Sequence, residues 1–118
     1  MPNVTTILPG HENRPETADP VSSEALQLLV FSATWCGPCR AMAPAIDDIA
    51  QDYAGDLVVV KIDIETSPDL AKEFDVRGVP TVITHRGGAI IDRHVGGMTR
   101  TRLALMIEDA LKRGDAAE

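Results

Sequence analysis

Two cysteines separated by two residues are the side chains in this sequence best suited to chemistry. Cys36 and Cys39 are the only cysteines among the 118 residues, and Gly37 and Pro38 lie between them. A disulfide between them would close too short a loop to restrict the unfolded chain much, so a structural bridge explains the pair poorly. A zinc site needs four ligands, and the three histidines are scattered along the chain without a suitable spacing. The pair is therefore interpreted as a redox-active dithiol.

The structure expected around the pair makes Cys36 the attacking thiol. Residues 26–33 are mostly apolar over the length of a strand, and apolar residues recur at helical spacing after the cysteines, at Met42, Ile46, Ile49 and Tyr53. Cys36 would thus close a strand-to-helix turn, where backbone N–H groups and the positive end of the helix favour an anion and lower the pKa of the thiol. Cys39 would lie one turn further on the same helix face, within reach for a disulfide, and is expected to be less exposed and to act second.

The rest of the chain predicts the elements that hold this turn in place. Residues 57–64 are a second apolar strand, which gives a right-handed parallel βαβ unit with the first strand and helix. A short helix begins at Ser67-Pro68, a hairpin joins residues 81–85 to 89–95, and a final helix covers about 100–112. The order β-α-β-α-β-β-α predicts an α/β fold with a mixed sheet of about four to five strands, flanked by helices on both faces.

The first 24 residues differ from the remainder in composition. They contain Pro2, Pro9, Pro15 and Pro20 among polar residues, and prolines at this density exclude a long helix. Residues 4–8 are a candidate for a short edge strand, and the rest of residues 1–24 is expected to be a mobile segment. Residues 25–114 are expected to form a single domain.

Charge and hydropathy narrow the possible functions. The 18 acidic residues against 11 basic ones give a formal net charge of −7, which argues against binding to nucleic acid phosphates. No apolar run approaches the ~20 residues that span a bilayer, and the N-terminus does not have the pattern of a signal peptide. The chain is therefore expected to be cytoplasmic and to bind neither nucleic acid nor membranes. Four polar residues are assigned to solvent-facing positions: Asp47, Asp48, His85 and His94.

Several motifs resemble those of the thioredoxin family. Residues 31–40, Phe-Ser-Ala-Thr-Trp-Cys-Gly-Pro-Cys-Arg, are similar to the thioredoxin active-site segment almost residue for residue. The similarity covers residues 28 to 111 and implies the thioredoxin fold and a thiol-disulfide oxidoreductase. Four further matches fall in register: Pro44 in the first helix, and residues 60–64, 76–81 and 95–97.

The resemblance implies a role for each residue around the dithiol. Cys36 would be the nucleophile, Cys39 the resolving thiol, and Pro80 a cis-proline that faces the disulfide. Two alternatives stay open. Without the resemblance, Pro80 would be interpreted as an ordinary trans proline in a loop, and the pair Gly96-Gly97 as a plain turn. Six residues would border the groove in which an extended substrate backbone docks: Trp35, Gly37, Pro38, Val79, Gly96 and Gly97.

Two departures from the family pattern bear on the mechanism. Thioredoxins have a buried aspartate, thought to relay the proton of the second cysteine, at the position that Val30 occupies here. Lys61, the usual partner of that aspartate, is left to pair with Asp63 or Glu65 on the same strand face, as electrostatic support for the site. The family also has an N-terminal helix, which the N-terminal prolines predict to be absent or shortened.

The sequence therefore predicts a reductase of protein disulfides in which Cys36 attacks and Cys39 resolves. Its redox group would be the Cys36–Cys39 disulfide, with no further cofactor and no metal. The expected partners are client proteins that carry disulfides and, from the family, a thioredoxin reductase, and the chain is expected to be a monomer. The alternative is a thioredoxin-fold binding or regulatory module, whose dithiol turns over slowly because Val30 replaces the aspartate.

Overall fold

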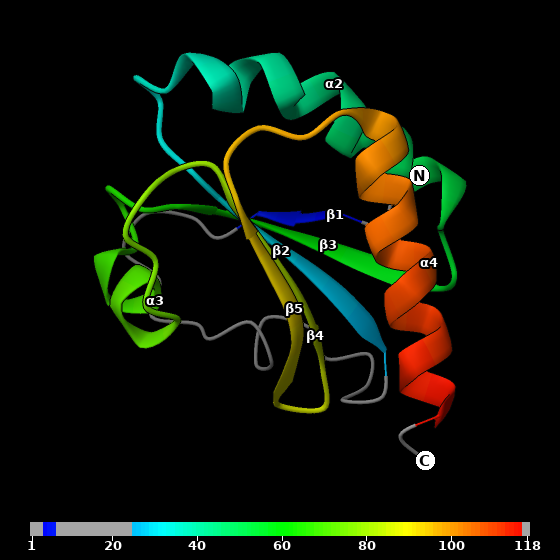
Figure 1. The fold of residues 1–118 in the computed structure, drawn as a ribbon. Helices are drawn as coiled ribbons and strands as arrows, with labels where there is room; N and C mark the ends of the chain where they lie inside the picture. The colour runs from blue at the N-terminus through cyan, green and yellow to red at the C-terminus, as the bar shows by residue number, and fades with distance from the viewer. Residues whose placement is uncertain (1–3, 7–24, 117–118) are drawn as a thin grey trace.

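The computed structural model describes residues 4–6 and 25–116, which form a mixed sheet with helices on both faces (Figure 1). From residue 25 onward the order of elements is the β-α-β-α-β-β-α order that the sequence predicted. The strands are β1 (Val4–Thr6), β2 (Leu26–Ser32), β3 (Leu57–Asp63), β4 (Thr81–Arg86) and β5 (Ala89–Val95). The helices are α2 (Gly37–Asp52), α3 (Pro68–Glu73) and α4 (Arg100–Ala116).

The strand order β1-β3-β2-β4-β5 places β2 at the centre of the sheet. β1 and β2 run parallel to β3, while β4 runs antiparallel to both of its neighbours, β2 and β5. The register aligns Val30 with Lys61 and Ser32 with Asp63, so the carboxyl ends of β2 and β3 meet at the same edge of the sheet. The loop that carries Cys36 begins at this edge, between β2 and α2.

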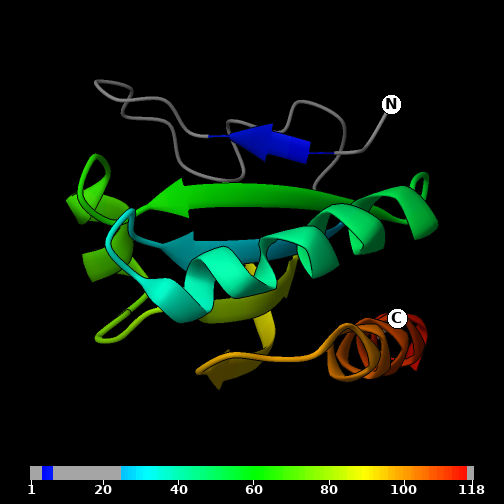
Figure 2. The same ribbon diagram turned by 90° about the horizontal axis from the view of Figure 1, so that it is seen from above.

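Side chains that alternate along β2 build a core on each face of the sheet. Leu28 and Val30 pack in a cluster with residues of α2 and α4, and Figure 2 shows α2 crossing this face. Leu29 and Phe31 pack on the opposite face with residues of α3. Because β2 is buried on both faces, it requires the continuous apolar run seen in the sequence.

The position of β4 between β2 and β5 corrects one prediction. The sequence assigned His85 to solvent because it precedes the turn of a hairpin. In the structure His85 is 4% exposed, and its ring lies edge-on to that of Phe74, with 5.9 Å between the ring centroids. Neighbouring strands on both sides and the Phe74 ring at the end of α3 therefore bury this histidine. His94, on the edge strand β5, is partly exposed.

The short strand β1 lies at one edge of the sheet. It pairs Val4–Thr6 with residues 59–61 of β3, and it falls within the range 4–8 proposed for an edge strand. The rest of residues 1–24 lies outside the described residues. The predictions that this segment is mobile and that the N-terminal helix is absent or shortened concern these residues and therefore stay predictions. None of the helices in the described ranges has the length and apolar character needed to cross a membrane.

Candidate active site

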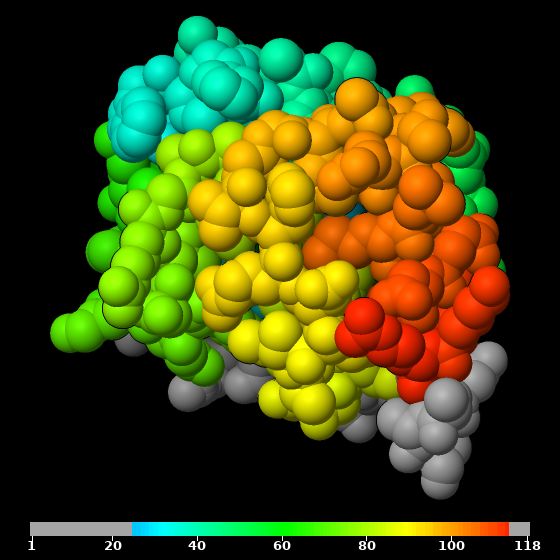
Figure 3. All heavy atoms as spheres, viewed as in Figure 1, coloured from blue at the N-terminus to red at the C-terminus, as the bar shows by residue number. Residues whose placement is uncertain are grey.

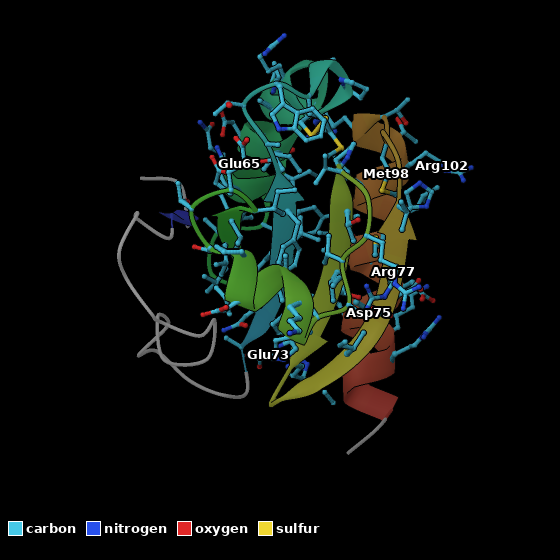
Figure 4. All side chains as sticks on the ribbon, turned by 90° about the vertical axis from the view of Figure 1, so that its left-hand side faces the viewer. Glu65, Glu73, Asp75, Arg77, Met98 and Arg102 are labelled. Atoms are coloured by element: carbon cyan, nitrogen blue, oxygen red, sulfur yellow. A yellow bond between two sulfur atoms is a disulfide. The ribbon has the colours of Figure 1, made fainter. Side chains whose placement is uncertain are left out.

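The dithiol lies at the start of α2, directly after the carboxyl end of β2 (Figure 4). Cys36 is the N-cap of the helix, Pro38 lies in its first turn, and Cys39 follows. The two cysteines form a disulfide, with their Cα atoms 5.3 Å apart. The backbone N–H of Cys39 donates a hydrogen bond to Sγ of Cys36 at 3.1 Å. An amide of the first helical turn thus points at the Cys36 sulfur, which is the interaction that stabilises a thiolate at a helix N-terminus.

The exposure of the two cysteines differs from the prediction. Cys36 is 4% exposed and Cys39 is 7% exposed, so Cys39 is not the more buried of the two in the disulfide form. Both pack with Ala33, and Val79 contacts the same cluster. Their positions relative to the end of α2, rather than their exposure, distinguish the two sulfurs.

Residues from two other loops lie beside the active-site turn. The Val79–Pro80 peptide bond is cis, so the alternative of a trans proline does not hold in this structure. The backbone carbonyl of Pro80 accepts a hydrogen bond from the N–H of Gly96 at 2.8 Å. A side chain added at Gly97 would have its Cβ 4.0 Å from Cβ of Pro38, which places the glycine pair next to the start of α2.

The residues that flank Cys36 in the active-site turn are exposed to solvent. Trp35 is 64% exposed, and Gly37 and Pro38 are also exposed. Gly96 has a φ of 111°, which by itself requires glycine, so the plain-turn explanation is sufficient for this residue. The structure brings the six predicted groove residues together around the disulfide, and their part in docking a substrate stays a prediction.

Glu65 was named from the sequence only as a possible partner of Lys61, and its contact with the active-site loop was missed. Its carboxylate accepts hydrogen bonds from Oγ1 of Thr34 at 3.2 Å and from Nε1 of Trp35 at 3.1 Å. Both donors precede Cys36, so Glu65 holds the loop that leads into the dithiol. The available signal was its position just after β3, because the ends of adjacent parallel strands meet at one edge of a sheet.

The ion pair made by Lys61 also differs from the prediction. The sequence offered Asp63 or Glu65 as its partner, but Nζ of Lys61 lies 3.0 Å from Oδ1 of Asp47 on α2. The carboxylate of Asp63 instead accepts a hydrogen bond from the backbone N–H of Glu65 at 2.8 Å. Asp63 also lines an open hollow of about 310 Å³ next to Cys39 and Arg40. Asp47 is exposed, as predicted, and its charge is engaged by Lys61.

A small cavity lies beside Val30 and the second cysteine. It has a volume of about 70 Å³, and it is lined by Val30, Cys39 and Lys61 together with Ser32, Met42, Ala43 and Ile46. Val30 therefore faces the dithiol side of the sheet, as its position in β2 predicted. The one ionisable group that lines the cavity besides Cys39 is the Lys61 ammonium, so no carboxylate borders it within the described residues.

The described residues also bear on a metal site. In the ranges 4–6 and 25–116, no group of three or more His, Cys, Asp or Glu side chains lies close enough together to hold a metal ion. Cys36 and Cys39 are bonded to each other.

Comparisons with known proteins agree with this geometry. A model of the family described as Thioredoxin matches residues 13–109. A thioredoxin from Synechocystis is 40% identical over 93 residues, which cover 79% of this chain and 87% of that protein. A bifunctional thioredoxin reductase/thioredoxin from Mycobacterium leprae is 39% identical over 94 residues, which cover 80% of this chain and 20% of that protein. The structure of a mutant thioredoxin from Halobacterium salinarum superimposes with a TM-score of 0.76 at 30% identity, and the match covers 91% of this chain and 89% of that one.

Proposed function

The chain belongs to the thioredoxin family, has the thioredoxin fold and is a thiol-disulfide oxidoreductase, and we propose that it reduces disulfide bonds of client proteins. The observation that carries this proposal is the placement of Cys36. Its sulfur accepts the N–H of Cys39 at the start of α2, and it lies beside the exposed ring of Trp35. A thiolate formed at this sulfur would be stabilised by the helix end and reachable from the groove.

The reaction would run in two thiol–disulfide exchanges. The Cys36 thiolate attacks one sulfur of the client disulfide, which forms a mixed disulfide and releases the other client sulfur as a thiolate that takes up a proton. Cys39 then gives up its proton and attacks the Cys36 sulfur, which restores the Cys36–Cys39 disulfide and releases the second client thiol. Two electrons pass from the dithiol of this chain to the client.

Backbone groups beside the disulfide support binding of an extended client segment. Val79 contacts the disulfide cluster, and Gly96 and Gly97 border the same turn without side chains. An extended segment would form main-chain hydrogen bonds there, which give affinity with little dependence on sequence. Trp35 would supply apolar contact area at the end of the groove.

The partners and location follow from the same proposal. A thioredoxin reductase would return the disulfide to the dithiol, and the name of the bifunctional Mycobacterium leprae relative joins these two activities in one protein. No cofactor beyond the Cys36–Cys39 disulfide takes part. We place the chain in the cytoplasm as a monomer.

The cavity beside Val30 favours a second candidate function. Because no carboxylate in the described residues borders it, Cys39 lacks a proton acceptor at the position where the family has one. A slow second exchange would suit a binding or regulatory module that holds its partner as a mixed disulfide.

An insulin-reduction assay with NADPH and a thioredoxin reductase separates the two functions. The native chain should turn over repeatedly, Cys39→Ser should accumulate a mixed disulfide with insulin, and Cys36→Ser should do neither. A native chain that forms the mixed disulfide but does not turn over would support the regulatory module. Alkylation of the reduced protein, mapped by mass spectrometry, should label Cys36 first, and preferential labelling of Cys39 would contradict the order of attack.

A further inference from the structure

Three exposed arginines lie on one side of the groove, in a chain with a net charge of −7. Arg77 lies in the loop between α3 and β4, Arg93 in β5 and Arg102 in the first turn of α4. Figure 4 shows Arg77 and Arg102 on the same side of the molecule as Met98, which follows the glycine pair of the groove. We call these three arginines the arginine rim.

Contacts between neighbouring segments place the arginine rim next to the groove. A Cβ added at Gly78, between Arg77 and Val79, would lie 3.7 Å from Cγ1 of Val95. The guanidinium of Arg93 donates to the backbone carbonyl of Asp75 at 3.5 Å, which ties β5 to the loop before β4. In Figure 3 this loop, the end of β5 and the start of α4 form one continuous surface below the start of α2.

The fold does not account for the charge of Arg102. Cations are unfavourable in the first turn of a helix, because the positive end of the helix dipole lies there. Arg100 in the same turn is compensated by ion pairs with Asp48 and Asp52 on α2. The backbone N–H of Arg102 donates a hydrogen bond to Oγ1 of Thr99, the residue before the helix. In the part of the chain that the structure describes, the guanidinium of Arg102 forms no ion pair.

The other two arginines are also available to a partner. Arg77 lies 3.0 Å from a carboxylate oxygen of Asp75, but the Arg77 side chain is 85% exposed, and such exposed pairs contribute little. Arg93 contacts a backbone carbonyl rather than a carboxylate. Two carboxylates lie beside the rim: that of Asp75 pairs with Arg77, and that of Asp92 accepts the backbone N–H of Arg93 at 2.8 Å. The three arginines outnumber these two carboxylates by one, in a chain that is negative overall.

We propose that the arginine rim binds acidic segments that flank the target disulfide of a client protein. This inference rests on the proposed function and adds a preference among clients to it. Exposed guanidinium groups pair with carboxylates through planar, bidentate hydrogen bonds. Opposite charges near a binding site also raise the rate of productive encounter. The carboxylate of Glu65, by contrast, accepts hydrogen bonds from Thr34 and Trp35, the two residues that precede Cys36.

Two disulfide peptides that differ only in the residues next to one cysteine test the proposal. One carries three aspartates and the other three asparagines at the same positions, and each is reduced by the reduced native chain in single turnover. The ratio of the two rate constants, divided by the same ratio for reduction by dithiothreitol, removes the intrinsic effect of the charges on the exchange. At 0.1 M salt, where charges act over about 10 Å, the rim should outweigh the distant negative charges and make this ratio greater than one.

Matched variants assign the preference to the rim. Arg102→Gln and Arg77→Gln should each lower the ratio by about 1.5- to 5-fold, which is the range for one exposed ion pair. Lys112→Gln changes the net charge equally at an exposed position near the far end of α4, and it should leave the ratio unchanged. The thermal midpoint of Arg102→Gln should not fall, because the variant removes a cation from the positive end of a helix.

The outcomes of the test are distinct. A ratio of one or less for the native chain would overturn the inference, and so would an equal effect of Lys112→Gln and Arg102→Gln. Loss of the preference at 1 M salt would support it, because charges are then screened within about 3 Å. Failure to reduce either peptide would instead contradict the proposed function.

Discussion

Val30→Asp would place a carboxyl group in the cavity beside Cys39. Val30 is 6% exposed, and it shares the cavity of about 70 Å³ with Cys39 and Lys61. Its Cα lies opposite that of Lys61 in the β2–β3 pair. The substitution nearly preserves the volume of the side chain, so it changes polarity and charge in the core without creating a large void.

Two contributions to the loss of stability can be separated. Loss of the buried methyl groups of the valine costs about 1.5 kcal/mol at every pH. The carboxyl group adds a pH-dependent part, because burial disfavours its ionised form and raises its pKa above the unfolded value of about 3.9. Each unit of this rise costs about 1.4 kcal/mol at neutral pH. The Lys61 ammonium on the wall of the cavity limits the rise, so the total loss at pH 7 should be about 2–4 kcal/mol.

The pH-dependent part has a defined sign and a matched control. Well below pH 4 the carboxyl group is protonated in both the folded and the unfolded chain, so this part is absent, and at pH 4 it is only about half a kcal/mol. It grows as the pH rises, because the unfolded chain ionises first, and it becomes constant above the folded pKa. The control is Val30→Asn, because an asparagine side chain has nearly the shape of an aspartate but carries no charge. The two variants should have similar free energies of unfolding near pH 4, and Val30→Asp should be about 1–2 kcal/mol less stable at pH 7.

Urea denaturation of both variants at pH 4 and pH 7 measures this difference. Single-turnover release of a disulfide-linked peptide measures the chemistry, because the new carboxylate should accept the proton of Cys39 and speed the second exchange. Val30→Asn should not have this effect. Equal stability of the two variants at pH 7, together with equal release rates, would refute the assignment of residue 30 to the cavity beside Cys39.

Three further substitutions or deletions test other contacts of the structure. Glu65→Ala should free the indole of Trp35, lower its fluorescence anisotropy and raise KM for a disulfide peptide about two- to fivefold, because a hydrogen bond of this kind is worth about 1 kcal/mol; unchanged anisotropy would contradict the contact. The hydrogen bond from Tyr53 to Glu108, together with burial, raises the pKa of Tyr53 to about 12. The stabilisation of the fold by this hydrogen bond is therefore complete below pH 10 and is lost as the pH rises through 12. The difference in urea stability between the native chain and Tyr53→Phe should therefore shrink between pH 9 and pH 12, and a constant difference would be evidence against the assignment. Deletion of residues 1–24 removes β1 and leaves β3 as the edge of the sheet, which should cost about 1 kcal/mol in a thermal melt; an unchanged midpoint would show that the segment is dispensable.

Local patterns in the sequence were sufficient to predict the frame of the site. The apolar run of β2 and the helical spacing after it follow from burial on known faces. These two patterns place Cys36 at the start of the helix, because only a short turn fits between the end of the strand and the first residues of the helix. The groove residues followed from the family motifs, and the structure places them around that turn.

Contacts between distant elements could not be predicted in the same way. Lys61 pairs with Asp47 because α2 crosses the face of the sheet on which Lys61 lies, and strand alternation alone offered only neighbours on the same strand. His85 is buried because β5 and the ring of Phe74 cover a position that looks like the end of a hairpin. Glu65 reaches Trp35 through the alignment of β2 with β3. Each of these contacts depends on the packing of elements and leaves no periodic signal in one segment.

The valine at position 30 separates two properties that a buried carboxylate would combine, namely charge in the core and proton exchange with Cys39. In this chain the Lys61–Asp47 pair lies at the partly exposed border, with side chains 34% and 55% exposed, and no carboxylate borders the cavity within the described residues. The core thus avoids the desolvation of a buried carboxylate, and we expect Cys39 to lose its proton to the solvent rather than to an adjacent carboxylate. The rate of client release should then rise with pH through the neutral and alkaline range, because Cys39 attacks only after its proton has passed to the solvent. Single-turnover release measured from pH 5 to pH 9 checks this, and a rise centred below pH 6 would show that a carboxylate accepts the proton after all.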